Sequence, residues 1–200
     1  MSLESIIRRC QEIGIGGIAI TDHDIIAGAL EMKRIAPFPV IVGEEILTLK
    51  GEIIGLFLTE NVPRRLSPEE TVTRIKAQGG LVCIPHPFDR FRHYAGIRSD
   101  ALKGILPHID IIEVFNSRTM LSADLAKARS FAQSNGFLLS AGSDAHCAAE
   151  LGAAYVEMPD FQGSAEFKAA LAQGQVFGHR TNPLIHISNS IRVLLSKLGG

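Results

Sequence analysis

Side chains that can bind metal ions or phosphate follow five short apolar segments of the chain. In chain order they are Asp22, His23 and Asp24 after residues 17–21, Glu44 and Glu45 after 39–43, His86 after 81–85, Asn116 and Arg118 after 109–115, and Asp144 and His146 after 137–142. Imidazole and carboxylate groups together suit Zn, Mn or Fe better than Ca or Mg. A carboxylate that bridges two such metals provides the clamp used in phosphoester hydrolysis. The chemistry indicated is therefore hydrolysis assisted by divalent metals.

Continuous apolar runs of this length are typical of strands that are buried on both faces of a parallel sheet. Parallel α/β folds place their functional groups at the carboxyl ends of the strands, and in barrels those ends meet at one mouth. Each residue alone has another explanation: Asp144 could cap a helix, His86 could be a core histidine, and Glu44 and Glu45 could line a solvated edge. Because such residues recur at the same position after five strands, a single shared site is favoured instead. The side chains expected to converge there are His23, Glu45, His86, Asp144 and His146.

The elements that must position these residues alternate between strands and amphipathic helices. Strands are expected at 17–21, 39–43, 51–58, 81–85, 109–115, 137–142 and 153–158. Apolar spacing predicts helices at 3–13 and around 167–171, and Ser67 and Ser122 are expected to cap two more. A turn at Lys50-Gly51 would join the second and third strands into a hairpin. This alternation predicts one α/β domain over residues 1–200 with mostly parallel pairing, as a barrel or a doubly wound sheet.

Composition excludes several classes of protein. Lys and Arg number 20 and Asp and Glu number 21, so a net charge of −1 argues against a surface built for duplex DNA. No apolar stretch approaches the ~20 residues that cross a bilayer, and the N-terminus lacks the order of a secretory signal. Three cysteines form no even framework, which predicts a reduced, cytoplasmic chain without a membrane partner. The absence of a GxSxG motif argues against a serine nucleophile.

The motifs at these strand ends resemble the PHP family, the polymerase and histidinol phosphatase domain of metal-dependent phosphoesterases. They are ITDHD (20–24), GEEI (43–46), IPHP (84–87), EVFNSR (113–118) and SDAH (143–146), in order through nearly the whole chain. The resemblance implies a distorted (βα)7 barrel with a site for up to three divalent metals at its C-terminal face. It further implies that Glu45 bridges metals and that Asp22 and Asp24 orient neighbouring groups. The ligands that it implies are His23, Glu45, His86, Asp144 and His146.

The sequence departs from the family pattern at two places. The family begins with a strand that carries an HxH pair, whereas this chain opens in the helix that would follow it. The expected fold is therefore a barrel truncated at its N-terminus by one strand, with fewer than three metals and an open edge that favours self-association. The family also often has a histidine near the start of the hairpin, where this sequence has Glu52. Glu52 would either replace that imidazole as a metal ligand or be solvated.

These features predict a divalent-metal-dependent phosphoesterase that hydrolyses a phosphomonoester or a small nucleotide with metal-activated water. Its partner would be a small phosphorylated substrate, a nucleotide or a short oligonucleotide among the candidates. Arg118 would clamp the phosphate, because its planar fork matches phosphate oxygens, and Asn116 would help to bind it. A surface arginine is the alternative for Arg118. The polar loop at 89–100, which carries Arg90, Arg92, His93 and Arg98, would either fold over the site or remain a surface excursion.

Two other functions compete with this prediction. The first is a truncated, catalytically impaired PHP-like domain that serves as a metal-binding or partner-binding scaffold, which the missing strand favours. The second is metal-dependent hydrolysis of a C–N bond on a related barrel. That class commonly uses a lysine at a strand end, and none of the strand ends here supplies one.

Overall fold

The structure is a computed structural model that describes residues 1–92 and 96–181. Its strands are β1 (Ile18–Ile20), β2 (Val40–Thr48), β3 (Gly51–Leu56), β4 (Leu81–Ile84), β5 (Ile111–Asn116), β6 (Leu138–Gly142), β7 (Ala154–Glu157) and β8 (Gln175–Gly178). Its helices are α1 (Leu3–Ile13), α2 (Ala27–Ile35), α3 (Pro68–Ala77), α4 (Ser99–Ile105), α5 (Ser122–Asn135) and α6 (Gly163–Leu171). Short 3-10 turns η1 and η2 lie at Leu106–His108 and Ala148–Glu150. No helix in these described ranges is long and apolar enough to cross a membrane.

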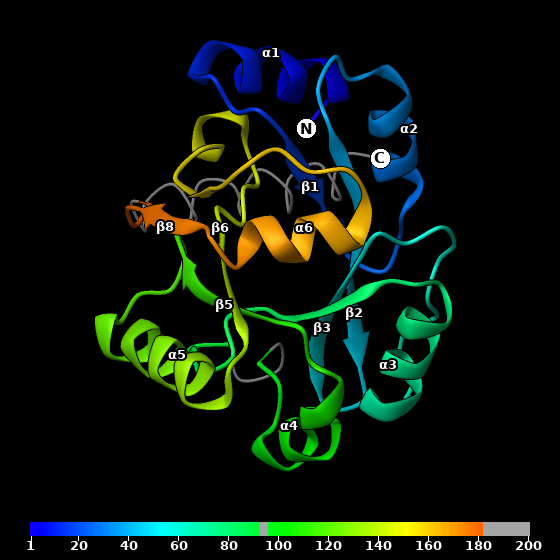
Figure 1. The fold of residues 1–200 in the computed structure, drawn as a ribbon, viewed down its shortest axis with the longest axis vertical. Helices are drawn as coiled ribbons and strands as arrows, with labels where there is room; N and C mark the ends of the chain where they lie inside the picture. The colour runs from blue at the N-terminus through cyan, green and yellow to red at the C-terminus, as the bar shows by residue number, and fades with distance from the viewer. Residues whose placement is uncertain (93–95, 182–200) are drawn as a thin grey trace, which may run out of the picture.

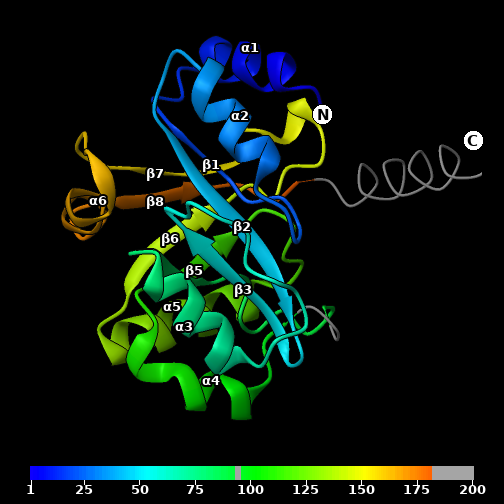
Figure 2. The same ribbon diagram turned by 90° about the vertical axis from the view of Figure 1, so that its right-hand side faces the viewer.

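Six strands form one sheet in the order β1-β2-β3-β4-β5-β6, and β7 and β8 pair separately. The β1–β2, β4–β5 and β5–β6 pairs are parallel, whereas β2–β3 and β3–β4 are antiparallel. The sheet curls into part of a barrel rather than lying open (Figures 1 and 2). Helix α2 packs on β1 and β2, α3 on β3 and β4, and α5 on β5 and β6. This arrangement confirms the predicted α/β class, with a pairing more mixed than the alternation indicated.

The hairpin between β2 and β3 confirms the predicted turn at Lys50-Gly51. Gly51 has a φ of +116°, and a Cβ there would collide with the backbone of Ile97, so glycine is required. The predicted strand at 39–43 was too short, because β2 continues to Thr48 through its pairing with β3. Glu44 and Glu45 therefore lie inside a strand rather than beyond its end.

Serine residues were predicted to cap two helices, and the structure confirms one of these caps and not the other. Ser67 caps α3 as expected, with its Oγ accepting from the Glu70 N–H at 3.1 Å and Pro68 in the first turn. The Ser122 prediction was wrong, because Leu121 precedes α5 and no side-chain hydrogen bond caps that helix. Ser122 Oγ instead accepts from Arg180 Nη2 at 2.7 Å, which ties the segment after β8 to the start of α5.

The core lies inside the curl of the sheet. Its fully buried side chains include Ile46 and Ile53 of the hairpin, Ile84 of β4 and Ile112 of β5. Isoleucine is restricted at χ1 and favours the strand conformation, so these residues both stabilise their strands and pack in the core. The core therefore fixes the strands whose carboxyl ends carry the predicted site.

Candidate metal centre

His23, Glu45 and Glu52 come together from three strands of the sheet. His23 follows β1 and forms a parallel bridge with Glu45 on β2, through backbone hydrogen bonds of 3.0 and 3.2 Å. Its Nδ1 lies 3.3 Å from Glu45 Oε2 and 3.8 Å from Glu52 Oε1. Glu52 on β3 is a diagonal neighbour of Glu45 in the hairpin register, so both side chains point to the same face. One possible ligand atom from each of the three lies within 4.8 Å of the others.

His86 adds a second imidazole to this group. It lies two residues beyond β4, and its Nε2 is 3.2 Å from Glu45 Oε1 and 3.5 Å from Glu52 Oε2. The side chain is only 1% exposed. Its backbone has a φ of 32°, in the left-handed region that residues other than glycine rarely adopt. His23, Glu45, Glu52 and His86 are named the metal cluster below.

The metal cluster fits a divalent cation in two respects. Two carboxylates and two imidazoles are the donor types that Zn, Mn and Fe prefer. Two buried atoms, Glu52 Oε2 and His86 Nδ1, have no hydrogen-bond partner among the described residues. Buried polar atoms without partners are costly, and a cation beside the Glu52 carboxylate would remove one such cost.

The charges in the cluster depend on one another. Burial raises the pKa of Glu52, and the neighbouring Glu45 carboxylate raises it further, against the opposing charges of His86 and His23. Burial acts to lower the pKa of His86, but the hydrogen bond to Glu45 and the charges of Glu113 and Glu45 leave it above its ordinary value. Two carboxylates therefore share a buried space in which one of them resists ionisation. A divalent cation relieves this kind of repulsion.

Glu44 and Glu45 are adjacent in the chain but have different surroundings. Successive side chains of a strand point to opposite faces, so Glu44 points away from the cluster. Its carboxylate accepts from the Val62 N–H at 2.9 Å and from Asn61 Nδ2 at 3.0 Å, and burial raises its pKa. Glu44 therefore holds the 61–62 segment, and Glu45 alone of the two faces the cluster.

Asp144 and His146 lie beyond the end of β6 in a second group that contains two arginines. Asp144 pairs with Arg92 through Oδ2, and Asp144 Oδ1 lies 3.8 Å from Arg118 Nη1 and 3.5 Å from His146 Nδ1. Arg118 Nη1 also contacts His146 Nδ1. Burial acts to raise the pKa of Asp144, but the nearby Arg92 outweighs it, with Arg118 and His146, and lowers that pKa. Arg92, Arg118, Asp144 and His146 are named the arginine group below.

Glu113 connects the metal cluster to the arginine group, although the sequence pattern alone did not mark it as a site residue. This buried carboxylate on β5 accepts from the His86 N–H at 2.8 Å and from Asn116 Nδ2 at 3.0 Å. Asn116 Nδ2 in turn lies 3.4 Å from Asp144 Oδ2. In the sequence, Glu113 is recognisable as a charged residue within the apolar run at 109–115. Asn116 is 2% exposed, and its Oδ1 accepts from the Arg118 N–H at 2.9 Å, so its whole amide is engaged with protein groups.

The polar loop after β4 reaches the site through Arg92. Asp89 anchors the loop, because its carboxylate accepts from the Phe91 N–H at 3.0 Å and from Thr119 Oγ1 at 3.1 Å. Arg90 pairs with Asp124 instead, at 2.8 Å. His93 lies outside the described residues, and the last two residues of the predicted loop, Ser99 and Asp100, begin α4.

Of the two aspartates in the first motif, Asp24 has a defined positioning contact. Its Oδ1 accepts from the Leu47 N–H at 2.9 Å, and its Oδ2 lies 3.5 Å from Arg64 Nε. Asp24 thus joins the chain after β1 to β2, next to the His23 bridge.

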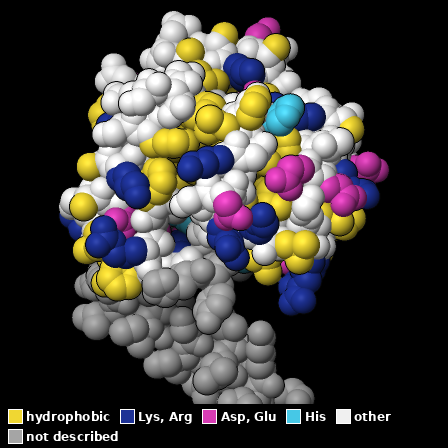
Figure 3. Space-filling view, turned by 90° about the horizontal axis from the view of Figure 1, so that it is seen from below, with side chains coloured by type: hydrophobic (Ala, Val, Ile, Leu, Met, Phe, Trp, Pro, Cys, Tyr) yellow, Lys and Arg dark blue, Asp and Glu magenta, His cyan; other side chains and the backbone are white. Residues whose placement is uncertain are grey.

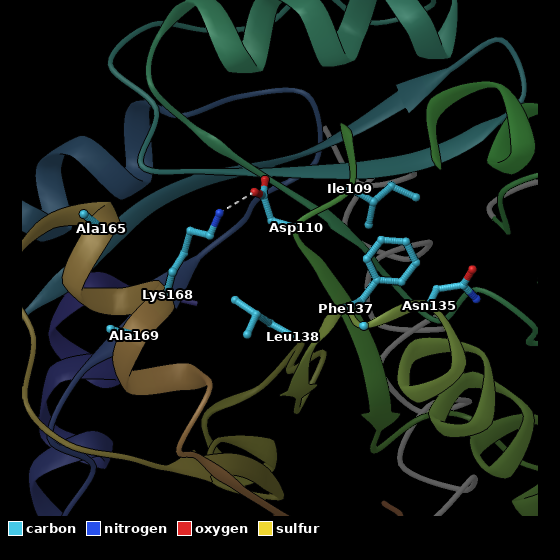
Figure 4. A pocket seen from close by; sticks show the side chains of 9 residues that line it. Ile109, Asp110, Asn135, Phe137, Leu138, Ala165, Lys168 and Ala169 are labelled. Atoms are coloured by element: carbon cyan, nitrogen blue, oxygen red, sulfur yellow. Dashed lines mark hydrogen bonds and ion pairs between the residues drawn. The ribbon is translucent and has the colours of Figure 1, made fainter. Parts of the chain in front are cut away.

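A groove lies at the opposite ends of β5 and β6 from the candidate site, where these two strands begin (Figure 4). This groove of about 700 Å³ is lined mainly by apolar side chains, with Asp110 at its wall. Asp110 is held by Lys76, by Lys168 at 3.0 Å and by the Val82 N–H at 2.8 Å. None of the predicted site residues lines it. On the face of the molecule shown in Figure 3, basic side chains lie beside acidic and apolar ones rather than in a patch of one charge.

Solved structures share this fold at low sequence identity. A two-domain protein of Bacteroides vulgatus that contains a predicted PHP-like metal-dependent phosphoesterase aligns with a TM-score of 0.64 and 14% identity, covering 88% of this chain and 60% of that one. The lesion-specific endonuclease PfuEndoQ of Pyrococcus furiosus aligns with a TM-score of 0.57 and 15% identity, covering 88% and 53%. Endonuclease Q bound to a duplex with an abasic lesion gives 0.56 and 15%, covering 86% and 52%. The fold is therefore that of the PHP-like phosphoesterases.

Sequence comparison agrees with the fold. Residues 123–176 match the family model described as PHP-associated. Two uncharacterized proteins of Methanocaldococcus jannaschii, MJ1587 and MJ0417, are 43% and 40% identical over 116 and 122 residues. The matches cover 56% and 60% of this chain but only 65% and 52% of those proteins. The family-model match and the shared fold together support the resemblance to the PHP family.

Proposed function

We propose that this chain is a divalent-metal-dependent phosphoesterase. The observation that carries the proposal is the metal cluster, in which His23, Glu45, Glu52 and His86 direct donor atoms at one another across 3.2–3.8 Å. A divalent cation held by these residues would supply an activated water and would neutralise negative charge on phosphate oxygens. Mn, Zn and Fe are the candidate metals, because the donors are mixed imidazole and carboxylate.

The residues of this chain have separable roles in the proposed reaction. Glu45 contacts both histidines and is the candidate bridge between metals. Asp144 and His146 are further ligand candidates from the family motif, and Arg118 binds phosphate oxygens through its planar fork. Asn116 positions Arg118 and Asp144 rather than touching substrate, since its amide is fully engaged.

The number of metals depends on the free edge of β1. Within the described ranges β1 pairs with β2 alone, so its other edge is open to a further strand. We propose that a strand added to that edge, bearing the HxH pair of the family, would complete a three-metal site in a (βα)7 barrel. Without that strand, the metal cluster and Asp144 would hold fewer than three metals.

The substrate class is a phosphoester on a small molecule or on a nucleic acid strand. Endonuclease Q, which shares the fold, is solved with a duplex that has an abasic lesion at its active site. A nucleotide or short oligonucleotide is accordingly a reasonable first substrate for this chain. Its three free cysteines suit a reducing compartment such as the cytoplasm.

A second candidate function is a metal-binding or partner-binding scaffold without catalysis. The observation that favours it is the pairing of Asp144 with Arg92, which occupies a carboxylate that the family uses as a ligand. Activity separates the two candidates, because a scaffold that binds metal would still not hydrolyse a phosphoester.

The experiment is a hydrolysis screen over phosphomonoesters, nucleotides and short oligonucleotides with Mn²⁺, Zn²⁺ or Fe²⁺, together with Mn²⁺ titration calorimetry. Glu45→Gln is expected to lower Mn²⁺ affinity and turnover at least tenfold. Glu31→Gln is the matched control, because Glu31 lies on α2 and its ion pair within the described part of the chain is with Arg34. Mn²⁺ binding without turnover of any substrate would favour the scaffold. Turnover by Glu45→Gln at the wild-type rate would refute the assigned cluster.

A further inference from the structure

Arg92 is a cation inserted among acidic side chains. Its side chain is 23% exposed, and it pairs with Asp144 Oδ2 while its Nε lies 3.6 Å from Asp89 Oδ2. The carboxylates of Glu113 and Glu45 also act on it electrostatically and, with Asp144, hold its pKa above the ordinary value against burial. Two of these carboxylates, Asp144 and Glu45, are also proposed metal ligands, so Arg92 supplies positive charge beside the metal site.

The backbone around Arg92 directs its side chain to this place. The Arg92 N–H donates to the Asp89 carbonyl at 3.1 Å, and the Gly96 N–H donates to the Arg92 carbonyl at 2.8 Å. Asp89 itself is 8% exposed and is held by Phe91 and Thr119. These contacts hold the backbone of Arg92 beside the site independently of Asp144.

Two guanidinium groups flank one carboxylate. Arg92 contacts Oδ2 of Asp144, and Arg118 lies on the Oδ1 side at 3.8 Å. A metal bound by Asp144 would compete for the same oxygens and would repel the guanidinium of Arg92. Arg92 would then lose the Asp144 carboxylate as its partner. Its planar guanidinium, which can pair with a carboxylate, can pair equally with phosphate oxygens.

We propose that Arg92 is a second phosphate-binding arginine, and that its ion pair with Asp144 couples metal binding to phosphate binding. The proposal rests on the phosphoesterase function proposed above. Without metal, Asp144 holds Arg92 and phosphate binds weakly. With metal, Asp144 releases Arg92, which then joins Arg118 on the phosphate oxygens, so metal binds before substrate.

The test compares the wild-type chain with Arg92→Gln, Arg92→Lys and Arg98→Gln. Arg98 lies at the end of the same loop, is 70% exposed and pairs with Asp100, so Arg98→Gln is the matched control. Titration calorimetry measures Mn²⁺ affinity, and equilibrium dialysis measures the affinity for inorganic phosphate with and without Mn²⁺. Circular dichroism and thermal unfolding show whether each variant is folded.

The expected result is that Arg92→Gln binds Mn²⁺ at least threefold more tightly and, with Mn²⁺ present, binds phosphate at least tenfold more weakly. Arg92→Lys restores part of the phosphate affinity, and Arg98→Gln matches the wild type in both measurements. The proposal is overturned if folded Arg92→Gln keeps both affinities within twofold of the wild type, or if it binds Mn²⁺ more weakly. The expected affinity changes without hydrolysis of any phosphoester would refute the proposed function while supporting the role of Arg92; hydrolysis with unchanged affinities would do the reverse.

Discussion

Replacing Glu113 by alanine tests how the two halves of the site are joined. The Glu113 carboxylate is buried on β5 and accepts from the His86 N–H and from Asn116 Nδ2. Alanine removes the Oε2 atom that accepts both hydrogen bonds. Since His86 has a left-handed backbone, its N–H cannot simply return to regular strand pairing.

The magnitude follows from these two hydrogen bonds. A buried N–H without an acceptor costs about 1–3 kcal/mol, so His86 accounts for most of the loss. Asn116 loses less, about 0.5–1.5 kcal/mol, because its Nδ2 remains 3.4 Å from Asp144. Burial raises the pKa of Glu113, so removing the charge returns part of the stability. The net expectation for Glu113→Ala is a decrease of about 1–4 kcal/mol in the free energy of unfolding.

Urea unfolding followed by circular dichroism at neutral pH measures this change. Glu113→Gln keeps one side-chain oxygen for the His86 N–H and is expected to lose less than half as much. Glu157→Ala, at the exposed end of β7, controls for loss of a strand glutamate and should lie within about 0.5 kcal/mol of the wild type. If Glu113→Ala is as stable as this control, then the carboxylate does not hold His86 and the connection between the two groups is wrong.

Three further predictions follow from individual contacts. Gly142→Ala should lower unfolding stability by about 2 kcal/mol, because its Cβ would overlap Glu113 Oε1, whereas Gly16→Ala, with open space around it, should not; equal urea midpoints would contradict this. His23→Gln should leave thermal unfolding unchanged, since its side chain is 58% exposed, yet weaken Mn²⁺ binding at least tenfold by calorimetry; unchanged binding would remove His23 from the cluster. Burial acts to raise the pKa of Asp110, but hydrogen bonds from two lysines and a backbone N–H lower it. Its stabilisation is therefore present above its unfolded pKa of about 3.9 and is lost as the pH falls through the lower folded value, so the stability difference between wild type and Asp110→Asn should shrink in acid urea titrations rather than stay constant.

The hairpin and the strand ends could be predicted from the sequence because local signals specify them. Lys50-Gly51 marks a turn, and apolar runs that end in polar residues mark buried strands. The α2 helix was not predicted, because Ile26 precedes it without a side-chain cap and Gly28 lies in its first turn. The extension of β2 to Thr48 could not be predicted either, because its pairing with β3 overrides the polar character of Glu44 and Glu45.

In the site, too, some residues could be predicted from local sequence signals and others depend on tertiary contacts. His23, Glu45 and His86 follow or occupy predicted strands, so their proximity follows from the topology once the strands are paired. Glu113 needed knowledge of which backbone N–H it would face, and no periodic pattern carries that information. Arg92 needed the path of an irregular loop, which depends on Asp89 reaching Thr119 across the fold.

The left-handed backbone conformation of His86 and Asp144 lowers the stability of the fold, while their side chains are needed at the site. The two have φ values of 32° and 49°, and each follows a strand of the sheet by two residues. A residue other than glycine in such a conformation costs on the order of 1–3 kcal/mol, which the surrounding packing must offset. Glycine would adopt either conformation without that cost, but it would remove an imidazole or a carboxylate from the site. Selection for thermostability alone would therefore favour glycine at these two positions, and only selection for activity would keep the histidine and the aspartate.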